Sequence, residues 1–357
     1  MKKRRLWVLL AAVAVVGVLG AGAGPAAAAS KSAATPPFKV FAAASLYRAF
    51  PAMVAPFKAA YPQYKKVKFV FNFQGTDTLV AQIELGAPAD LFAGASTKYG
   101  TQLFKDGFSS APRLFCQNQL CVIVPKANLA NIKSLGDLTK TGVMIAIGDA
   151  AVPIGAYTQT VLTNITTGGV YGANYSSQVM SNVVATVSNV NMVTALVKLD
   201  EVDAGFVYVS DKMAAGTSVT KIAIPATYQS NPLPTYPIAA VKNAARPLMA
   251  SRFIAFAMSA RGQKILAKWG FLAKPYPVIK TIAPTSGAVG STVTITGTNF
   301  FSSGTVKIGG KVATTSAWTA TSITATVPAG LAAGATTVTV TSDGRSSKKA
   351  GSFTVTP

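Results

Sequence analysis

Histidine is absent from the chain, and this absence removes several classes of site at once. Ser-His-Asp and Cys-His catalysis both need an imidazole base, and many zinc sites use imidazole ligands. Carboxylates are also scarce, because 11 acidic residues stand against 33 lysines and arginines. Only two cysteines are present, which is too few for a site built from thiolates alone. The sequence therefore predicts no enzyme activity, no catalytic residues, no metal-cation site and no cofactor.

Long apolar runs are missing after the N-terminus. Residues 1–29 combine a basic start, an apolar stretch at 6–19 and an alanine-rich end, which is the pattern of a signal peptide. The apolar stretch is short for a membrane span, although an uncleaved anchor is the alternative. We expect a secreted protein, periplasmic or extracellular and associated with the cell surface, with a short linker at residues 30–37.

The net charge of +22 is spread along the chain rather than gathered in one basic segment. No basic patch interleaved with aromatic residues is present, so nucleic acid is not expected as a partner. A positive field of this kind attracts anions and anionic surfaces. The alternative is that the charge only keeps the protein soluble.

Strand-like and helix-like segments alternate between residues 38 and 271, which favours an α/β architecture with parallel sheets. Two apolar strands end at Ser45 and at Thr76 and then pass into helical patterns. Free backbone N–H groups and the helix dipole favour an anion at such helix starts. Ligands of α/β sheets bind beyond the carboxyl ends of the strands, where these two hydroxyls are expected. This part of the chain therefore reads as a binder of a small oxyanion.

From residue 277 the composition changes to threonine, serine, glycine, valine and alanine. Short alternating strands with regular turns follow, at residues 292–296, 305–308, 322–327 and 337–341. This pattern predicts an all-β sandwich over residues 277–357.

Residues 38–272 resemble the molybdate-binding proteins of ABC transporters. The resemblance is carried by FAAASL (41–46), QIELGAPAD (82–90), VIVPK (122–126), IAIGD (145–149) and AGFVY (204–208). It implies a periplasmic-binding-protein-like fold of two lobes, residues 38–115 with 237–272 and residues 116–236, joined by two crossovers. It also implies a tetrahedral ligand, molybdate or tungstate, and a membrane ABC permease as the partner.

The resemblance also implies a set of ligand positions. The predicted oxyanion-binding residues are Ser45, Thr76, Ile154, Val190 and Tyr208, of which Ile154 and Val190 would act through their backbone N–H groups. Thr76 stands where the family usually has serine. Asp77 is a further departure, because a carboxylate beside an anion would repel it. It could affect selectivity, or it could stabilise the start of its helix instead.

Hydroxyl and amide donors suit a fully deprotonated anion, which only accepts hydrogen bonds. Phosphate keeps a proton near neutral pH and needs an acceptor, so a site made only of donors rejects it. These considerations favour molybdate or tungstate, with another oxyanion such as sulfate as an alternative.

The C-terminal region resembles the immunoglobulin-like IPT/TIG domain. The matching segments are IAPTSG (282–287), GSTVTITG (290–297), NF (299–300), VKIGG (306–310) and VPAG (327–330). Such modules act as spacers or interaction surfaces. Because this tail is cationic, we expect it to contact the anionic cell envelope. An alternative function is a surface interaction protein whose sandwich binds a partner or the envelope.

Two further points stay open in the sequence. Cys116 and Cys121 could pair in an oxidising compartment, with geometry deciding the outcome. An enzyme with Ser45 as nucleophile is the remaining alternative, but a Ser-x-x-Lys arrangement is missing because position 48 is Arg48.

Overall fold

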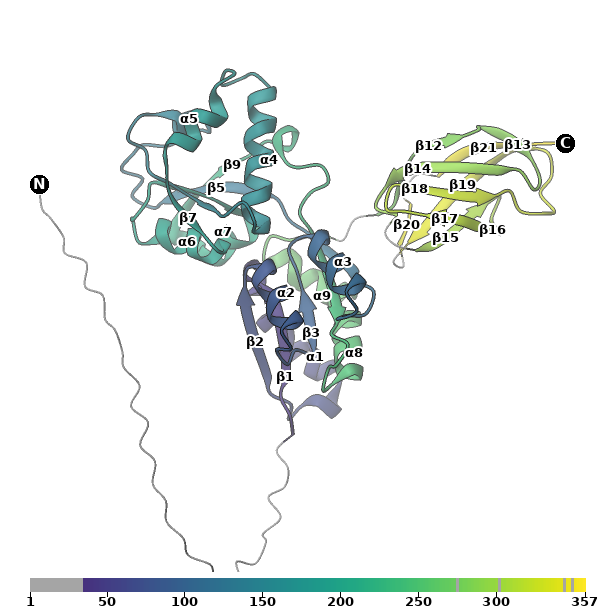
Figure 1. The fold of residues 1–357 in the computed structure, drawn as a ribbon, viewed down its shortest axis with the longest axis horizontal. Coiled ribbons are helices and arrows are strands. Elements are labelled where there is room, and N and C mark those ends of the chain that lie inside the picture. Colours follow the sequence, from purple (N-terminus) through teal and green to yellow (C-terminus); the bar gives the residue numbers. More distant parts are fainter. Residues whose placement is uncertain (1–34, 274–275, 301–302, 343–344, 348–349) are drawn as a thin grey trace, which may run out of the picture. The chain divides into compact units, whose positions relative to one another are not determined.

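The computed structural model describes residues 35–273, 276–300, 303–342, 345–347 and 350–357 (Figure 1). The predicted signal peptide at residues 1–29 lies outside these residues. The described part contains two sheets covered by helices, followed by two sheets without helices.

The first sheet has the strand order β11-β4-β10-β3-β1-β2. Strand β1 runs parallel to β2 and β3, whereas β10 runs antiparallel to β3 and β4. The prediction of parallel sheets therefore holds for only part of it. The strands are β1 (Phe38–Ala43), β2 (Phe69–Gln74), β3 (Leu91–Ala93), β4 (Arg113–Gln117), β10 (Thr235–Ala240) and β11 (Leu272–Ala273). The helices of this lobe are α1 (Ala49–Ala60), α2 (Thr76–Glu84), α3 (Thr97–Lys105), α8 (Pro247–Met258) and α9 (Ala260–Lys268).

The second sheet has the order β7-β6-β8-β5-β9 and is mixed in the same way. Strand β6 is parallel to β7 and β8, and β5 is antiparallel to β8 and β9. The strands are β5 (Leu120–Pro125), β6 (Ile145–Gly148), β7 (Val183–Val187), β8 (Ala204–Tyr208) and β9 (Val219–Ala223). The helices are α4 (Pro153–Thr167), α5 (Tyr175–Ser181), α6 (Val190–Lys198) and α7 (Val209–Ala215).

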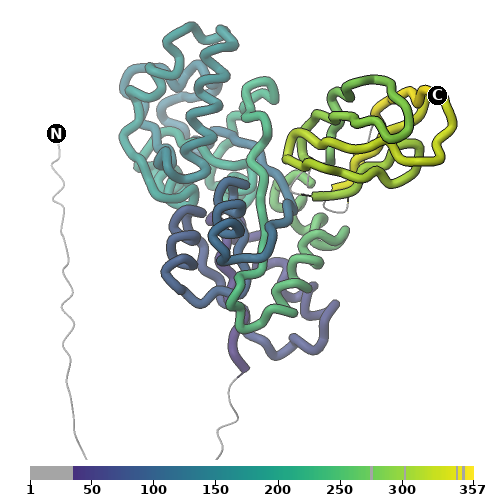
Figure 2. The backbone as a smooth tube through the Cα atoms, turned by 45° about the vertical axis from the view of Figure 1, so that its right-hand side comes forward, coloured from purple at the N-terminus to yellow at the C-terminus, as the bar shows by residue number. Residues whose placement is uncertain are grey.

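Sheet membership divides this region into two lobes, which we define as residues 36–117 with 235–273 (first lobe) and residues 118–234 (second lobe). The chain passes from one sheet to the other after β4 and returns before β10. The expected boundaries after residue 115 and before residue 237 fall inside these two strands. Figure 2 shows the green segment after residue 235 running back among the purple and blue segments of the first lobe.

The disulfide considered for Cys116 and Cys121 is not formed, because both thiols are free and buried. Cys116 lies on β4 in the first sheet, and Cys121 lies on β5 in the second sheet. The chain crosses from the first lobe to the second between these two cysteines. Each thiol therefore packs in a different hydrophobic core. Burial raises the pKa of both thiols, and that of Cys121 reaches about 12.

Two long helical patterns are interrupted in the structure. The segment predicted as one helix from Ser45 starts as a 3-10 turn, η1 (Ala44–Leu46), and the α-helix begins only at Ala49. The last helical segment of the first lobe is likewise divided into two helices, α8 and α9. Ser259 ends α8 and caps α9, since its hydroxyl accepts the Gly262 N–H at 3.2 Å. Short 3-10 turns also occur at η2 (Pro62–Tyr64), η3 (Gly136–Thr139), η4 (Gly216–Ser218) and η5 (Ala226–Tyr228).

Asp90 ties three elements of the first lobe together. Its carboxylate is 2% exposed and accepts the Lys39 N–H at 2.7 Å and the Arg246 N–H at 2.8 Å. These donors belong to β1 and to the residue before α8, so one side chain connects the sheet to the C-terminal helices. The role is structural, because Asp90 is not among the residues that line the pocket described below.

The Asp90→Asn substitution should therefore weaken the fold. In Asp90→Asn, one backbone donor would face the amide nitrogen, and we expect the free energy of unfolding to fall by about 1–2 kcal/mol. Denaturant unfolding followed by circular dichroism measures this change. The exposed Asp106 gives the control, since Asp106→Asn should leave the unfolding midpoint unaltered. An equal midpoint for Asp90→Asn and the parent protein would contradict the assignment.

The C-terminal region forms two packed sheets, as predicted for a sandwich. One has the order β12-β14-β18-β17 and the other β13-β21-β19-β15-β16, with β20 paired to β19. The strands are β12 (Val278–Ala283), β13 (Ser286–Ala288), β14 (Thr292–Thr298), β15 (Gly304–Ile308), β16 (Lys311–Ala313), β17 (Thr315–Trp318), β18 (Ser322–Thr326), β19 (Gly334–Ser342), β20 (Arg345–Ser346) and β21 (Gly351–Thr356). Alternate side chains of β14 and β19 point into the shared core, which explains their alternating sequence.

None of the helices in the described ranges combines the length and the apolar character that crossing a bilayer requires.

Candidate oxyanion-binding site

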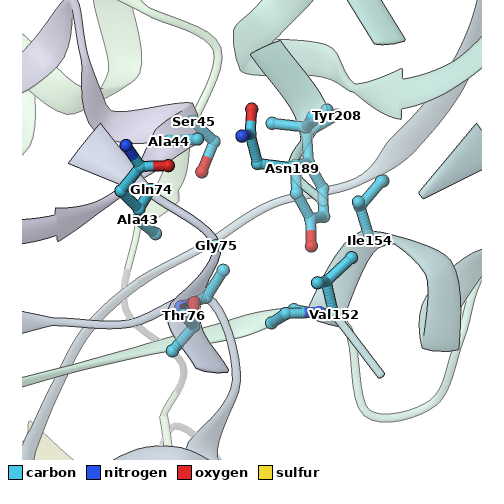
Figure 3. A pocket seen from close by; sticks show the side chains of 13 residues that line it. Ala43, Ala44, Ser45, Gln74, Gly75, Thr76, Val152, Ile154, Asn189 and Tyr208 are labelled. Atoms are coloured by element: carbon cyan, nitrogen blue, oxygen red, sulfur yellow. Dashed lines mark hydrogen bonds between the residues drawn. The ribbon is translucent and has the colours of Figure 1, made fainter. Parts of the chain in front are cut away.

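A small pocket lies where loops of both lobes meet (Figure 3). Its volume is about 20 Å³, on the measure in which one buried water needs roughly 10–15 Å³. The space suits a compact guest of few atoms. The lining residues are Ala43, Ala44, Ser45, Gln74, Gly75, Thr76, Ala95, Val152, Pro153, Ile154, Asn189, Val190 and Tyr208.

All five predicted ligand residues line this one pocket. Three of them carry hydroxyl groups, and Figure 3 shows the side chains of Ser45, Thr76 and Tyr208 around a common space. Each is nearly inaccessible to solvent, with exposed fractions of 4%, 1% and 1%. A buried hydroxyl normally has a hydrogen-bond partner. A hydroxyl of this pocket that has none therefore indicates where a ligand atom could bind.

The hydroxyl of Tyr208 is buried and has no hydrogen-bond partner among the described residues. Burial raises the pKa of this phenol well above its ordinary value of 10, so the group keeps its hydrogen at all physiological pH values. A buried O–H without an acceptor is costly, because it has lost its hydrogen bonds to water. The group is therefore a donor placed to meet an acceptor in the pocket.

Backbone donors reach the pocket from the starts of three helices. Thr76 is the first residue of α2, Ile154 is the second residue of α4, and Val190 is the first residue of α6. The N–H groups in the first turn of a helix have no partner within that helix, and the helix dipole adds partial positive charge there. Asn189 caps α6 by accepting the Met192 N–H at 3.2 Å, which satisfies one of these groups. The remaining donors at Ile154 and Val190 lie at the pocket wall.

None of the residues that line the pocket carries a charge. Asp77 is not one of them, although it is close. A Cβ atom built on Gly75 would lie 2.6 Å from Asp77 Oδ1, and that oxygen is buried without a hydrogen-bond partner in the described structure. Asp77 also helps to raise the pKa of Tyr99, after the larger effect of burial. Its suggested part in selectivity stays a prediction.

The two lobes approach closely beside Gly75. A Cβ atom built on Gly75 would lie 2.6 Å from the carbonyl oxygen of Ser188, which precedes α6 in the second lobe. Tyr99 of α3 also donates its hydroxyl to the carbonyl oxygen of Ala151, just before α4. The two lobes are therefore in direct contact beside the pocket.

Behind the pocket, Asp211 is fully buried in the first turn of α7. It accepts the Tyr208 N–H at 3.2 Å through Oδ2, while Oδ1 has no hydrogen-bond partner among the described residues. Burial raises its pKa to about 8, because the charged form has lost its hydration. Near neutral pH the carboxyl is therefore largely uncharged, and an acid close to the pocket does not repel an anion.

Sequence reasoning missed Tyr236 and Asn118, which stand directly behind Ser45. The Tyr236 hydroxyl lies 2.9 Å from Ser45 Oγ, and the amide nitrogen of Asn118 lies 3.4 Å from the same phenol oxygen. Both residues are fully buried on the two chain segments that connect the lobes. The sequence signal was that each of these polar residues stands beside an apolar run. That signal does not identify the partner, because Tyr236 lies 191 positions after Ser45.

Both parts of the chain resemble known proteins. Residues 38–272 match the family model for bacterial extracellular solute-binding proteins, and residues 277–355 match that of the IPT/TIG domain. The molybdate-binding protein ModA of Mycobacterium tuberculosis is 32% identical over 270 residues, covering 75% of this chain and 97% of that protein.

Two solved structures share the fold at low sequence identity. The periplasmic molybdate-binding protein of Azotobacter vinelandii is 20% identical with a TM-score of 0.56, and 67% of this chain and 100% of that chain are covered. The sulfate-binding protein SubI of Mycobacterium tuberculosis is 18% identical with a TM-score of 0.57, and the coverage is 66% and 86%. The chain therefore belongs to the bacterial extracellular solute-binding protein family and carries a C-terminal IPT/TIG domain.

Proposed function

We propose that this protein captures a fully deprotonated tetrahedral oxyanion, with molybdate or tungstate as its ligand. The observation that carries the proposal is the unpartnered hydroxyl of Tyr208 in a small, uncharged pocket that Ser45, Thr76, Ile154 and Val190 also line. Every one of these groups can donate a hydrogen bond. The name of the ModA relative supports molybdate as the first ligand to test.

The hydrogen bonds from these donors can supply enough free energy for micromolar binding. A hydrogen bond to a charged group contributes about 1.5–3 kcal/mol, so five contribute about 7–15 kcal/mol before other costs are subtracted. Ordering of the lobes and loss of translational freedom oppose binding. A net value of about 8 kcal/mol corresponds to a Kd of about 1 µM. Micromolar or tighter binding follows without any charged side chain in contact with the anion.

Titration with molybdate, tungstate, sulfate and phosphate tests the proposal, with thermal unfolding and calorimetry as readouts. A ligand that binds only the folded state raises the Tm as its concentration increases. We expect a shift with molybdate and tungstate and none with phosphate, and a much smaller shift for Tyr208→Phe. A response to sulfate alone would assign the site to another oxyanion. The absence of a shift with every anion would favour a surface interaction protein.

The capture step fits a role outside the cytoplasm, where the anion would be passed to a membrane ABC permease. The description of the matching family as extracellular supports this location. Binding without turnover is proposed, because the pocket offers hydrogen-bond donors and no residue arranged as a nucleophile with its base. No group of three or more His, Cys, Asp or Glu suited to a metal cation occurs among the described residues.

The C-terminal sandwich is proposed to hold the protein at an anionic envelope surface. Residues 277–357 carry six basic residues and one acidic residue, Asp343; the basic ones are Lys280, Lys307, Lys311, Arg345, Lys348 and Lys349. A net positive charge of this kind favours anionic surfaces, and the attraction weakens as salt increases.

Deletion of residues 277–357 should separate the two roles. The sandwich has its own core, and none of its residues lines the pocket. We expect an unchanged Kd for molybdate and a larger share of the protein in the growth medium, measured by calorimetry and by fractionation. Equal cell retention of the deleted and complete chains would contradict the anchoring role and leave anion capture unaffected.

A further inference from the structure

We propose that Tyr236 and Asn118 are positioning residues that set the direction of the Ser45 hydroxyl, so that its hydrogen is held toward the bound anion. The inference rests on the proposed function and adds the origin of selectivity against oxyanions that keep a proton. Neither residue lines the pocket, and both act through Ser45.

A chain of hydrogen bonds connects Ser45 to the second lobe. Ser45 Oγ and Tyr236 Oη are 2.9 Å apart. The amide nitrogen of Asn118 lies 3.4 Å from Tyr236 Oη and 2.8 Å from Ser210 Oγ. Ser210 is the second residue of α7, two residues after Tyr208. All four polar groups are buried, so water does not compete with these contacts.

The orientation of the Asn118 amide determines the direction of the whole chain. Its carbonyl oxygen accepts the Gln119 N–H at 2.9 Å, which places the NH₂ group toward Ser210 and Tyr236. An amide NH₂ group can donate but cannot accept. The hydrogen of the Tyr236 hydroxyl therefore has Ser45 Oγ as its acceptor, because the other neighbour of this phenol in the described structure offers only hydrogens.

Tyr236 retains the hydrogen that this arrangement requires. Burial raises the pKa of the phenol well above its ordinary value of 10. Its ring packs edge-on against Phe115 and Phe271, with centroid separations of 6.3 and 5.4 Å, so the hydroxyl is held in place by apolar contacts. With a lone pair of Ser45 Oγ occupied by Tyr236, the hydrogen of Ser45 is directed at another acceptor, and the pocket is where one can bind.

Thr76 follows the same rule on the other side of the pocket. The backbone N–H of Ala95 donates to Thr76 Oγ1 at 3.1 Å. A backbone N–H is always a donor, so the hydrogen of Thr76 also remains for the ligand. Two hydroxyls are thus fixed as donors. The partner of Thr76 is a backbone N–H group, and the partner of Ser45 is the Tyr236 hydroxyl, which Asn118 orients. The hydrogen of a hydrogen phosphate ion would face the hydrogens of Ser45 and Thr76, and this contact would oppose its binding.

Tyr236→Phe tests the inference, because it removes only the oxygen that orients Ser45 and keeps the ring in its packing. The Ser45 hydroxyl could then rotate and accept the proton of hydrogen phosphate. We expect the ratio of the phosphate Kd to the molybdate Kd, measured by calorimetry near neutral pH, to fall about tenfold. Asn118→Ala should lower the same ratio, since Tyr236 would lose the neighbour that fixes its direction.

Tyr175→Phe is the matched control. Tyr175 is also fully buried, and its hydroxyl makes one hydrogen bond, to the Leu135 carbonyl oxygen at 2.9 Å, away from the pocket. Its removal should lower stability and leave the Kd ratio unchanged. An unchanged ratio in Tyr236→Phe would overturn the inference, whatever happens to the absolute affinities. Failure of the unaltered protein to bind molybdate would instead overturn the proposed function itself.

Discussion

Gly75→Ala is expected to weaken molybdate binding by up to about 100-fold while leaving the stability of the unliganded protein close to that of the parent. The backbone of Gly75 has φ −55° and ψ 144°, values that alanine adopts without strain. The added Cβ atom would lie 2.6 Å from the Ser188 carbonyl oxygen across the lobes and 2.6 Å from Asp77 Oδ1, of which only the second belongs to a side chain that can move away. Overpacking of this kind costs about 1–3 kcal/mol, and 1.4 kcal/mol is a factor of ten in Kd. The cost falls on the closed form that holds the anion.

Calorimetry with molybdate and thermal unfolding without ligand separate these two effects. Gly205→Ala gives the opposite pattern as a control, because its Cβ atom would meet Val193 and Val197 within the second lobe, at 2.7 and 2.9 Å. That variant should lose Tm while its folded fraction binds molybdate as before. Full affinity in Gly75→Ala would mean that the anion is held in a more open arrangement than the one described.

Asp211→Asn should remove a pH dependence from both stability and binding. The carboxyl has a pKa of about 8 in the folded protein, against an ordinary value of about 3.8. Folding therefore takes up a proton between these values, so the stability that the neutral carboxyl supplies is complete below about pH 4 and is lost as the pH rises to about 8. The slope in the middle of this window reaches about 1.4 kcal/mol per pH unit. Asparagine stays neutral, so the variant should gain relative stability as the pH rises.

Anion binding should change in the same direction. Above about pH 8 the ionised Asp211 would stand behind Tyr208 and oppose a dianion in the pocket, so the Kd of the parent rises and that of Asp211→Asn does not. The neighbouring groups Tyr208, Tyr236 and Cys121 all have raised pKa values and remain neutral there, with Cys121 at about 12.

Denaturant unfolding and calorimetry from about pH 5 to 9 measure the two curves. Asp203→Asn is the control, because Asp203 also accepts one backbone N–H, that of Met144 at 2.8 Å, but is only half-buried. Parallel stability curves for Asp211→Asn and the parent would show that this carboxyl is ionised in the folded protein.

Features set by neighbouring residues could be predicted from the sequence. The sequence predicts a helix that starts at Thr76, the residue where α2 begins. Ser45 and Thr76 were placed at strand ends, and both line the pocket. These predictions depend on local signals, namely an apolar run that stops at a hydroxyl and a helical period that follows it.

Features set by distant residues could not be predicted in this way. Strand β10 enters the first sheet antiparallel, and nothing in its own sequence reports the direction of its neighbours. Asn118 and Tyr236 meet across 118 positions of the chain. Cys116 and Cys121 do not form a disulfide because the chain crosses between the lobes between them. Their short spacing in the sequence gives no sign of this crossover. Burial of Asp211, and with it the raised pKa, follows from packing around α7 rather than from its position after Tyr208.

The place of β10 in the first sheet has a consequence for how the protein is made. This strand lies between β3 and β4, yet it is synthesised after the whole second lobe. A growing chain can complete the second lobe while the first still presents two bare strand edges, and such edges recruit other chains. Premature termination before Thr235 would thus release a half-finished, aggregation-prone fragment. Successful biogenesis requires that the nascent first lobe be kept from such encounters until its last central strand emerges.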